Sequence, residues 1–120
     1  KGFTLVELLV VMVIVAMLLS IAAPRYFNHI DRAKEAALRQ SLNVMRDAID
    51  KFHGDQGRYP NTLEELVERR YLRKVPLDPL TDNAASWIVS PPPGESGDIA
   101  YDVHSGAAGQ GSDDKPYAEW

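Results

Sequence analysis

The chain has 120 residues, a formal net charge of −4 at pH 7 and no cysteine, and this length suits one small domain plus a membrane anchor. The lack of cysteine excludes a disulfide framework and thiol chemistry. Basic residues are interleaved with acidic ones along a predicted helix, so the clustered Lys and Arg of a nucleic-acid-binding protein are missing. A small head without disulfides often needs another staple, such as a metal ion or a partner subunit.

The first predicted element is an apolar run from Phe3 to Ala23, in which only Thr4, Glu7 and Ser20 are polar. An apolar helix of about 20 residues rises roughly 1.5 Å per residue and matches a hydrocarbon core about 30 Å thick. We therefore predict a membrane-spanning helix. The run is too long for a typical secretory signal peptide, and no small-x-small cleavage site follows it. A plain anchor is disfavoured because it gains nothing from a buried acid.

An amphipathic pattern continues the helix from Tyr26 to Phe52, with apolar residues recurring every three or four positions. A helix from Phe3 to about His53 would be roughly 75 Å long. The small remaining head cannot cover such a length, so the exposed half needs a bilayer or neighbouring helices. Pro24 lies inside this helix and removes one backbone donor, which predicts a kink or local melting near residues 20–24.

The head is predicted to contain one short helix and two strands. Thr62 and Glu65 have the spacing of a capping box, which starts a helix that runs to about Arg69. Residues 87–89 and 99–103 have the composition of strands, separated by a proline-rich turn and an acidic loop.

These elements together predict an α+β fold. It consists of a long N-terminal helix, with a transmembrane half and an amphipathic half, packed on a small antiparallel β-sheet head. Residues 105–114 contain mainly Gly, Ala, Ser and Asp, which is typical of a flexible loop.

The segment from Gly2 to Glu7, Gly-Phe-Thr-Leu-Val-Glu, resembles the N-terminal motif of the type IV pilin and pseudopilin family. Gly-Arg-Tyr-Pro at 57–60, Val-Pro-Leu-Asp-Pro at 75–79 and the loop after Ser105 extend the resemblance over most of the chain. They favour the major pseudopilin of type II secretion systems. The usual segment between the short helix and Val-Pro-Leu-Asp-Pro is curtailed in this chain.

The resemblance implies that a prepilin peptidase cuts after Gly2 and that Phe3 becomes the methylated N-terminus. Glu7 would act in assembly by pairing with that terminal ammonium, in the same subunit or a neighbour. Residues 1–25 would then form a leader remnant and the transmembrane half of the helix. Residues 26–120 would form the periplasmic head, including the amphipathic half.

The implied function is structural. Such a subunit sits in the bacterial inner membrane as a single-pass protein, and an assembly platform there adds it to a helical homopolymer with minor pseudopilins. Growth of this periplasmic filament drives protein export across the outer membrane. No catalytic constellation supports an enzyme, since His29, His53 and His104 are scattered and lack metal-ligand spacing.

Two alternatives stay open. Within the family, the chain would be a type IV pilin or a DNA-uptake pseudopilin, although such pilins often close their C-terminal region with a disulfide. From another class, it would be a membrane-anchored periplasmic binding module that never polymerises. Such an anchor needs neither cleavage after Gly2 nor the acid at Glu7.

In major pseudopilins a loop similar to 105–114 binds calcium, so the resemblance implies a calcium site. The Ser105 carbonyl, Asp113 and Asp114 match the family's ligands. Ala108 stands where the family has its first aspartate, which removes one carboxylate from a cation that requires six to eight oxygen ligands. A weakened calcium site and a metal-free polar loop are both compatible with these residues.

Overall fold

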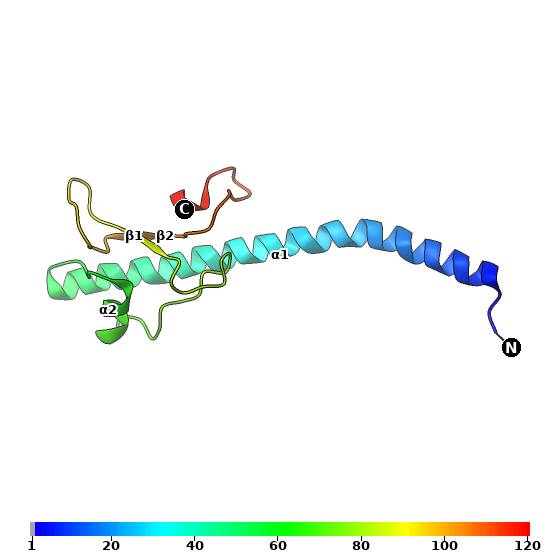
Figure 1. The fold of residues 1–120 in the computed structure, drawn as a ribbon. Coiled ribbons are helices and arrows are strands. Elements are labelled where there is room, and N and C mark those ends of the chain that lie inside the picture. Colours follow the sequence, from blue (N-terminus) through cyan, green and yellow to red (C-terminus); the bar gives the residue numbers. More distant parts are fainter. Residues whose placement is uncertain (1) are drawn as a thin grey trace. The chain divides into compact units, whose positions relative to one another are not determined.

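The computed structural model describes residues 2–120, so Lys1, which the sequence places in the leader remnant, lies outside the described part. Figure 1 labels the helices and strands of the chain. In chain order the elements are α1 (Leu5–Gln56), α2 (Leu63–Glu68), β1 (Ile88–Ser90), β2 (Asp102–His104) and a short 3-10 helix (Tyr117–Glu119). A long N-terminal helix with a small antiparallel sheet is the predicted α+β fold.

The chain divides into two compact units, which meet in sequence between Ala33 and Lys34. The predicted division after residue 25 concerned the bilayer surface, and it stays a prediction.

In the N-terminal unit, α1 begins with a reciprocal cap between Thr4 and Glu7. The Thr4 hydroxyl accepts the Glu7 N–H at 3.2 Å, and the Glu7 Oε2 accepts the Thr4 N–H at 3.2 Å. This is a capping box, because it satisfies two backbone donors at the helix start. The sequence analysis missed it, although Thr-x-x-Glu before an apolar run is its known signal.

The helix runs without a break through Pro24. Proline cannot donate to the Ser20 carbonyl one turn earlier, while the Ser20 hydroxyl itself donates to the Met17 carbonyl at 2.7 Å. The predicted local melting of residues 20–24 is therefore wrong for this structure.

In the C-terminal unit, one face of α1 builds the core. This face carries the buried side chains of Leu38, Leu42, Met45, Ile49 and Phe52, at spacings of three and four. The core also contains Leu63 and Leu66 of α2, Leu72, Trp87 and Val103. The predicted apolar face extended back to Ile30, but Ala33 and Ala37 are exposed, so the core begins later on the helix.

The short helix α2 confirms the predicted cap, because the Thr62 hydroxyl accepts the Glu65 N–H at 3.2 Å. Glu65 reaches back to the N–H of Asn61 at 3.1 Å rather than to Thr62 itself. Its carboxylate also pairs with Arg58 at 3.0 Å. The Arg58 hydrogen bonds are the largest influence that lowers the pKa of Glu65.

The two strands pair antiparallel in the register Ile88–His104, Val89–Val103 and Ser90–Asp102. Both are displaced from their predicted positions. The Ala100 N–H donates to the Pro60 carbonyl at 2.7 Å, which takes it out of the strand ladder. Trp87 precedes β1 and is buried, with its indole N–H on the Pro76 carbonyl at 2.7 Å.

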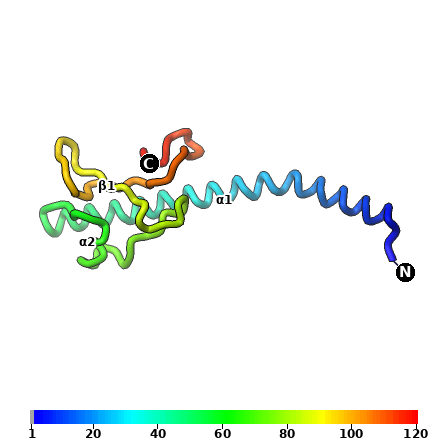
Figure 2. Tube along the Cα trace, viewed as in Figure 1, coloured from blue at the N-terminus to red at the C-terminus, as the bar shows by residue number. Residues whose placement is uncertain are grey.

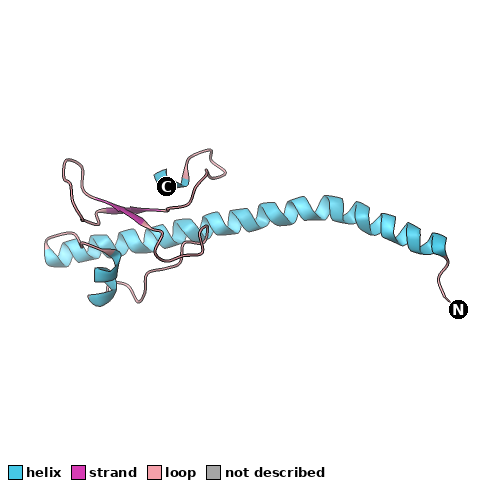
Figure 3. Ribbon diagram, in the orientation of Figure 1, coloured by secondary structure: helices cyan, strands magenta, loops and turns pink. Residues whose placement is uncertain are grey.

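Loops make up much of the head outside α1, as Figure 3 shows in pink. In Figures 1 and 2 both α2 and the strand pair lie along the last part of α1. The fold therefore presents two regions with chemical interest: the first turn of α1, and the loop that follows β2.

Candidate functional site

The first two described residues, Gly2 and Phe3, make no contact that explains them. Phe3 is 90% exposed. A Cβ added at Gly2 would meet no heavy atom within 4 Å, and Gly2 is not among the residues with positive φ. No packing or backbone requirement within this unit accounts for the glycine. A requirement for glycine would have to come from a molecule that acts on this segment.

The apolar side chains that follow are exposed along the whole first part of α1. From Leu5 to Ile21 the large apolar side chains keep between 45% and 73% of their surface accessible. Within residues 2–120, α1 is the helix long and apolar enough to cross a membrane. Surface of this kind needs lipid or other apolar helices around it.

Glu7 is the only acid in this apolar stretch. Its position at the third residue of the helix gives it a local role, because its carboxylate holds the Thr4 N–H. The positive end of the helix dipole also favours a negative charge there. The structure thus shows what Glu7 does within one chain, and its predicted role between chains stays a prediction.

The loop predicted to bind calcium begins at a buried residue. Ser105 is completely buried, and its hydroxyl donates a very short hydrogen bond to the carboxylate of Asp78, which is also completely buried. The same hydroxyl accepts the Ala107 N–H at 3.1 Å. Asp78 in turn accepts the Leu80 N–H at 2.9 Å. These contacts join the start of the loop to the segment before β1.

The paired aspartates at the end of the loop are exposed. Asp113 lies 3.8 Å from the guanidinium of Arg39 and accepts the Lys115 N–H at 3.2 Å. Asp114 adopts a positive φ of 60° and donates its N–H to the Gly111 carbonyl at 3.1 Å. The contacts of Ser105 and of Asp113 therefore lead to different parts of the head.

These surroundings fit a calcium ion poorly. Over residues 2–120, no three His, Asp or Glu side chains gather closely enough to hold a metal. Asp102, a carboxylate on β2 just before the loop, is paired with Arg46 at 2.8 Å. Calcium prefers several oxygens free to converge on one point. The calcium assignment stays a prediction from the resemblance.

Sequence reasoning missed the residue that contacts this loop most closely, which is Glu35. Its carboxylate accepts the Ser112 N–H at 2.9 Å, the Ser112 hydroxyl at 2.7 Å and the Tyr117 hydroxyl at 3.3 Å. The hydrogen bond from the Ser112 side chain is the main influence that lowers the pKa of Glu35 below its ordinary value of 4.5, against the opposing effect of desolvation.

A signal for Glu35 was present in the sequence. It stands three residues before Leu38 on the apolar face of α1, and it is buried like the residues that follow it. Its spacing of four residues from Arg39 had instead suggested an ion pair on the solvated face of the helix. An acid at an apolar position of an amphipathic helix indicates a buried polar contact.

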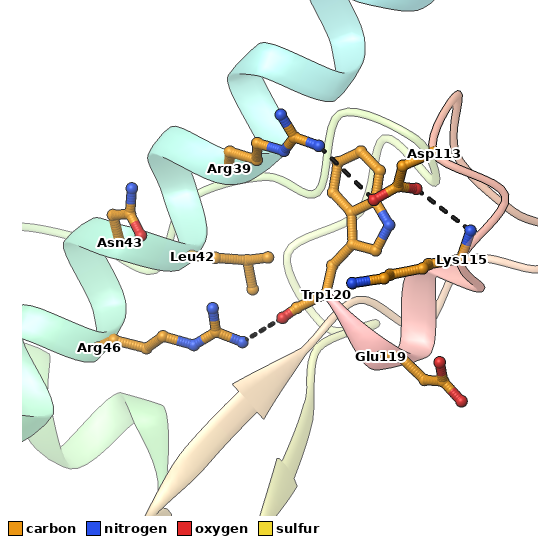
Figure 4. A pocket seen from close by; sticks show the side chains of 8 residues that line it. All are labelled: Arg39, Leu42, Asn43, Arg46, Asp113, Lys115, Glu119 and Trp120. Atoms are coloured by element: carbon orange, nitrogen blue, oxygen red, sulfur yellow. Dashed lines mark hydrogen bonds and ion pairs between the residues drawn. The ribbon is translucent and has the colours of Figure 1, made fainter.

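Two arginines on α1 complete the contacts around the C-terminal segment, and Figure 4 shows both. The Arg39 guanidinium lies 4.5 Å from the centroid of the Trp120 ring. Arg46 donates to the Trp120 carbonyl at 2.6 Å and to the Val103 carbonyl at 2.9 Å. A groove of about 260 Å³ lies here. Its lining consists of Arg39, Leu42, Asn43, Arg46, Asp113, Lys115, Glu119 and Trp120.

Comparison with known proteins supports the same family as the motif at the N-terminal residues. The family model of the prokaryotic N-terminal methylation motif matches residues 1–23. No solved structure matches the chain significantly.

Three relatives share one name, type II secretion system core protein G. The protein of Pseudomonas aeruginosa is 32% identical over 140 residues, which cover 100% of this chain and 94% of the relative. The protein of Escherichia coli is 31% identical and covers 88% of this chain and 79% of the relative. The protein of Vibrio cholerae is 29% identical and covers 93% of this chain and 88% of the relative. The chain therefore belongs to the family of type II secretion system core protein G, the major pseudopilins.

Proposed function

We propose that this chain is the structural subunit of a type II secretion pseudopilus and that it polymerises through α1 to drive protein export across the outer membrane. The observation that carries the proposal is the exposed apolar surface from Leu5 to Ile21, with one acid at its start. The described part of the chain buries no residue of this apolar surface. It can leave a bilayer at low cost only if other apolar helices replace the lipid.

The subunit begins as a single-pass protein of the inner membrane, with its head in the periplasm. A prepilin peptidase removes the leader after Gly2, and Phe3 becomes the methylated N-terminus. The inner-membrane assembly platform then transfers the subunit into the periplasmic pseudopilus, which also contains minor pseudopilins. The function is structural, so the energy for export comes from components other than this chain.

Glu7 sets the register between subunits by pairing with the terminal ammonium of Phe3, in its own chain or in a neighbour. A charge at the centre of a bilayer costs about 2.5–3.5 kcal/mol, and less at the shallow depth of Glu7. The capping contact with Thr4 reduces the cost further, because the carboxylate keeps a hydrogen bond while it waits for a partner. An ion pair of this kind contributes specificity rather than stability.

Three variants separate the charge of Glu7 from its capping role. Glu7→Leu removes both, Glu7→Gln removes the charge but keeps an oxygen for the Thr4 N–H, and Thr4→Ala removes one half of the cap but keeps the charge. We expect Glu7→Leu and Glu7→Gln to insert normally into the membrane and to form no filaments under electron microscopy. Thr4→Ala should still form them.

The outcomes distinguish the competing functions. Normal filaments from Glu7→Gln would show that capping, not charge, is what assembly needs. A native chain that is cleaved and anchored but never forms filaments, alone or with its secretion partners, would favour the membrane-anchored binding module. The names of the relatives favour a type II secretion pseudopilin over a type IV pilin or a DNA-uptake pseudopilin.

A further inference from the structure

The loop that the resemblance assigns to calcium is already connected to α1 by protein groups. Both oxygens of the Glu35 carboxylate are used by Ser112, one by its N–H and one by its hydroxyl. Glu35 is buried, although its partner Ser112 is exposed. A buried carboxylate is stable only when its charge is well hydrogen-bonded, so this contact fixes the position of the loop.

A second set of contacts holds the far side of the loop. Arg39 lies one turn after Glu35 on α1, pairs with Asp113 and stacks on the Trp120 ring. Arg46 holds the Trp120 carbonyl. In Figure 4 the Trp120 indole lies beside Arg39, and the Asp113 carboxylate lies between Arg39 and the Lys115 backbone. The Arg39 guanidinium thus places a positive charge of the protein itself 3.8 Å from the Asp113 carboxylate.

The glycines of the loop also have structural reasons that involve no metal. A Cβ at Gly106 would lie 2.1 Å from the Ser86 carbonyl oxygen. A Cβ at Gly111 would lie 2.1 Å from Cζ2 of Trp120 and 3.1 Å from a carboxylate oxygen of Asp113. These two glycines therefore permit close packing within the head.

We propose that residues 105–120 are closed onto α1 by a metal-independent clasp and that folding of the head does not depend on calcium. The clasp consists of Glu35, Arg39 and Arg46 on the helix, with Ser112, Asp113 and Trp120 as their partners. Of the three implied calcium ligands it contacts Asp113, and it holds Ser112 and Trp120 on the two sides of the paired aspartates without a cation. It therefore departs from the calcium site that the family resemblance implies. The loss of a carboxylate at Ala108 fits this departure.

The first experiment tests calcium on the full-length chain in detergent micelles. We expect no heat in a calorimetric titration with millimolar calcium chloride, and the same melting temperature in calcium and in EGTA. Ligand binding at a hundredfold excess over Kd raises the stability of a native state by about 2.7 kcal/mol, or a shift of roughly 10 °C or more for a domain of this size. A shift of that kind in the native chain would overturn the proposal. Ala108→Asp serves as the comparison. A calcium-dependent rise in melting temperature in this variant alone would show that the alanine at position 108 is the reason the native chain does not bind calcium.

The second experiment tests the clasp. Glu35→Ala should lower the melting temperature by on the order of 10 °C, because it leaves the charge-assisted hydrogen bonds of Ser112 unmade. Amide hydrogen exchange should increase over residues 105–120 and stay unchanged in α2. Asp50 is an exposed acid on the same helix, so Asp50→Ala is the matched control. It should change neither the melting temperature nor the exchange over residues 105–120.

Ser112→Ala provides a milder variant in case Glu35→Ala does not fold, since it removes the hydroxyl and keeps the N–H contact. We expect the same local increase in exchange with a smaller loss of stability. Unchanged exchange over 105–120 in both variants would show that the clasp does not hold the loop. Restoration of slow exchange by calcium in either variant would show that a metal does. Neither result involves filament formation, so the outcome is independent of the proposed function.

Discussion

The two ends of α1 have the same backbone and opposite surroundings. From Leu5 to Phe27 the large apolar side chains are exposed, and from Leu38 to Phe52 the inward face is buried in the head. The C-terminal part is stabilised by contacts within the chain. Over residues 2–33, the contacts of the N-terminal part are local: its cap, its helical hydrogen bonds, the Ser20–Met17 bond and the Tyr26–Phe27 ring contact. Its stability in place therefore depends on lipid or on other subunits. The C-terminal part of α1 therefore contributes to the core of the head, whereas the N-terminal part presents an apolar surface that lipid or other subunits must cover.

The largest expected effect concerns Gly2, where an added Cβ would meet no heavy atom within 4 Å. Gly2→Leu should abolish cleavage, although it disturbs nothing within the unit, because a Cβ there meets open space. Intact-mass measurement of the purified chain should find the full uncleaved mass in the variant and the shortened, methylated mass in the native protein. Normal maturation of Gly2→Leu would contradict the prediction that a peptidase reads this glycine.

A pair of phenylalanines sharpens the comparison between the two parts of α1. Phe52→Ala should lower the free energy of unfolding of the head by about 3–5 kcal/mol, because its fully buried ring leaves a cavity. Phe27→Ala, at a ring that is 62% exposed, should change it by less than about 0.5 kcal/mol. Denaturant unfolding of the full-length chain in detergent, followed by tryptophan fluorescence, provides the measurement. Equal losses would mean that the first unit shares the core of the head.

Two glycines give a smaller contrast within the head. Gly111→Ala should cost about 1–3 kcal/mol of unfolding free energy, since the new methyl group would overlap the Trp120 ring that Arg39 holds in place. Gly54→Ala, inside α1 and without neighbours, should instead gain up to about 1 kcal/mol through helix propensity. Thermal melting of the two variants beside the native chain tests whether Gly111→Ala lowers the stability and Gly54→Ala raises it. A stable Gly111→Ala would show that the Trp120 ring moves freely.

The smallest expected effect is a dependence on pH. Hydrogen bonds from Ser112 lower the pKa of Glu35 in the folded state below 4.5. Glu35 therefore contributes stability that is fully present above its unfolded pKa and is lost as the pH falls through its folded pKa. Glu35→Gln should flatten the stability profile below about pH 4.5, measured by unfolding at a series of pH values in the same detergent. An unchanged acid slope would assign that dependence to other carboxylates such as Glu65.

Periodicity and caps predicted the long elements of this fold because they depend on local sequence. The helix end near His53, the Thr62 cap and the α+β class followed from spacing and from turn residues. The strands were displaced because Ala100 binds Pro60, a contact distant in sequence that no local pattern contains. The core on α1 begins late because the residues that cover it, such as Trp87 and Val103, come from much later in the chain.

The candidate sites also differ in whether they depend on local sequence or on contacts between distant residues. Gly2, Phe3 and Glu7 lie within one continuous motif of six residues, so the sequence alone could propose them, and their roles stay predictions. The Glu35–Ser112 contact joins residues 77 positions apart, and neither residue belongs to a motif. Its single local sign was an acid at an apolar position of the helix. The resemblance directed attention to a metal for the same loop, and the side chains around it supply another way to hold it.

The apolar surface of the first part of α1 has one more consequence. Its side chains are apolar on every side of the helix from Leu5 to Leu19, apart from Glu7. In a bilayer, an apolar surface of this kind would give lipid little preference for any rotation of the helix about its own axis. Glu7 is the residue that makes one side of this helix different from the others. Under the proposed pairing, a subunit could therefore bring its acid to a neighbour by rotation alone, without tilting or unfolding the helix.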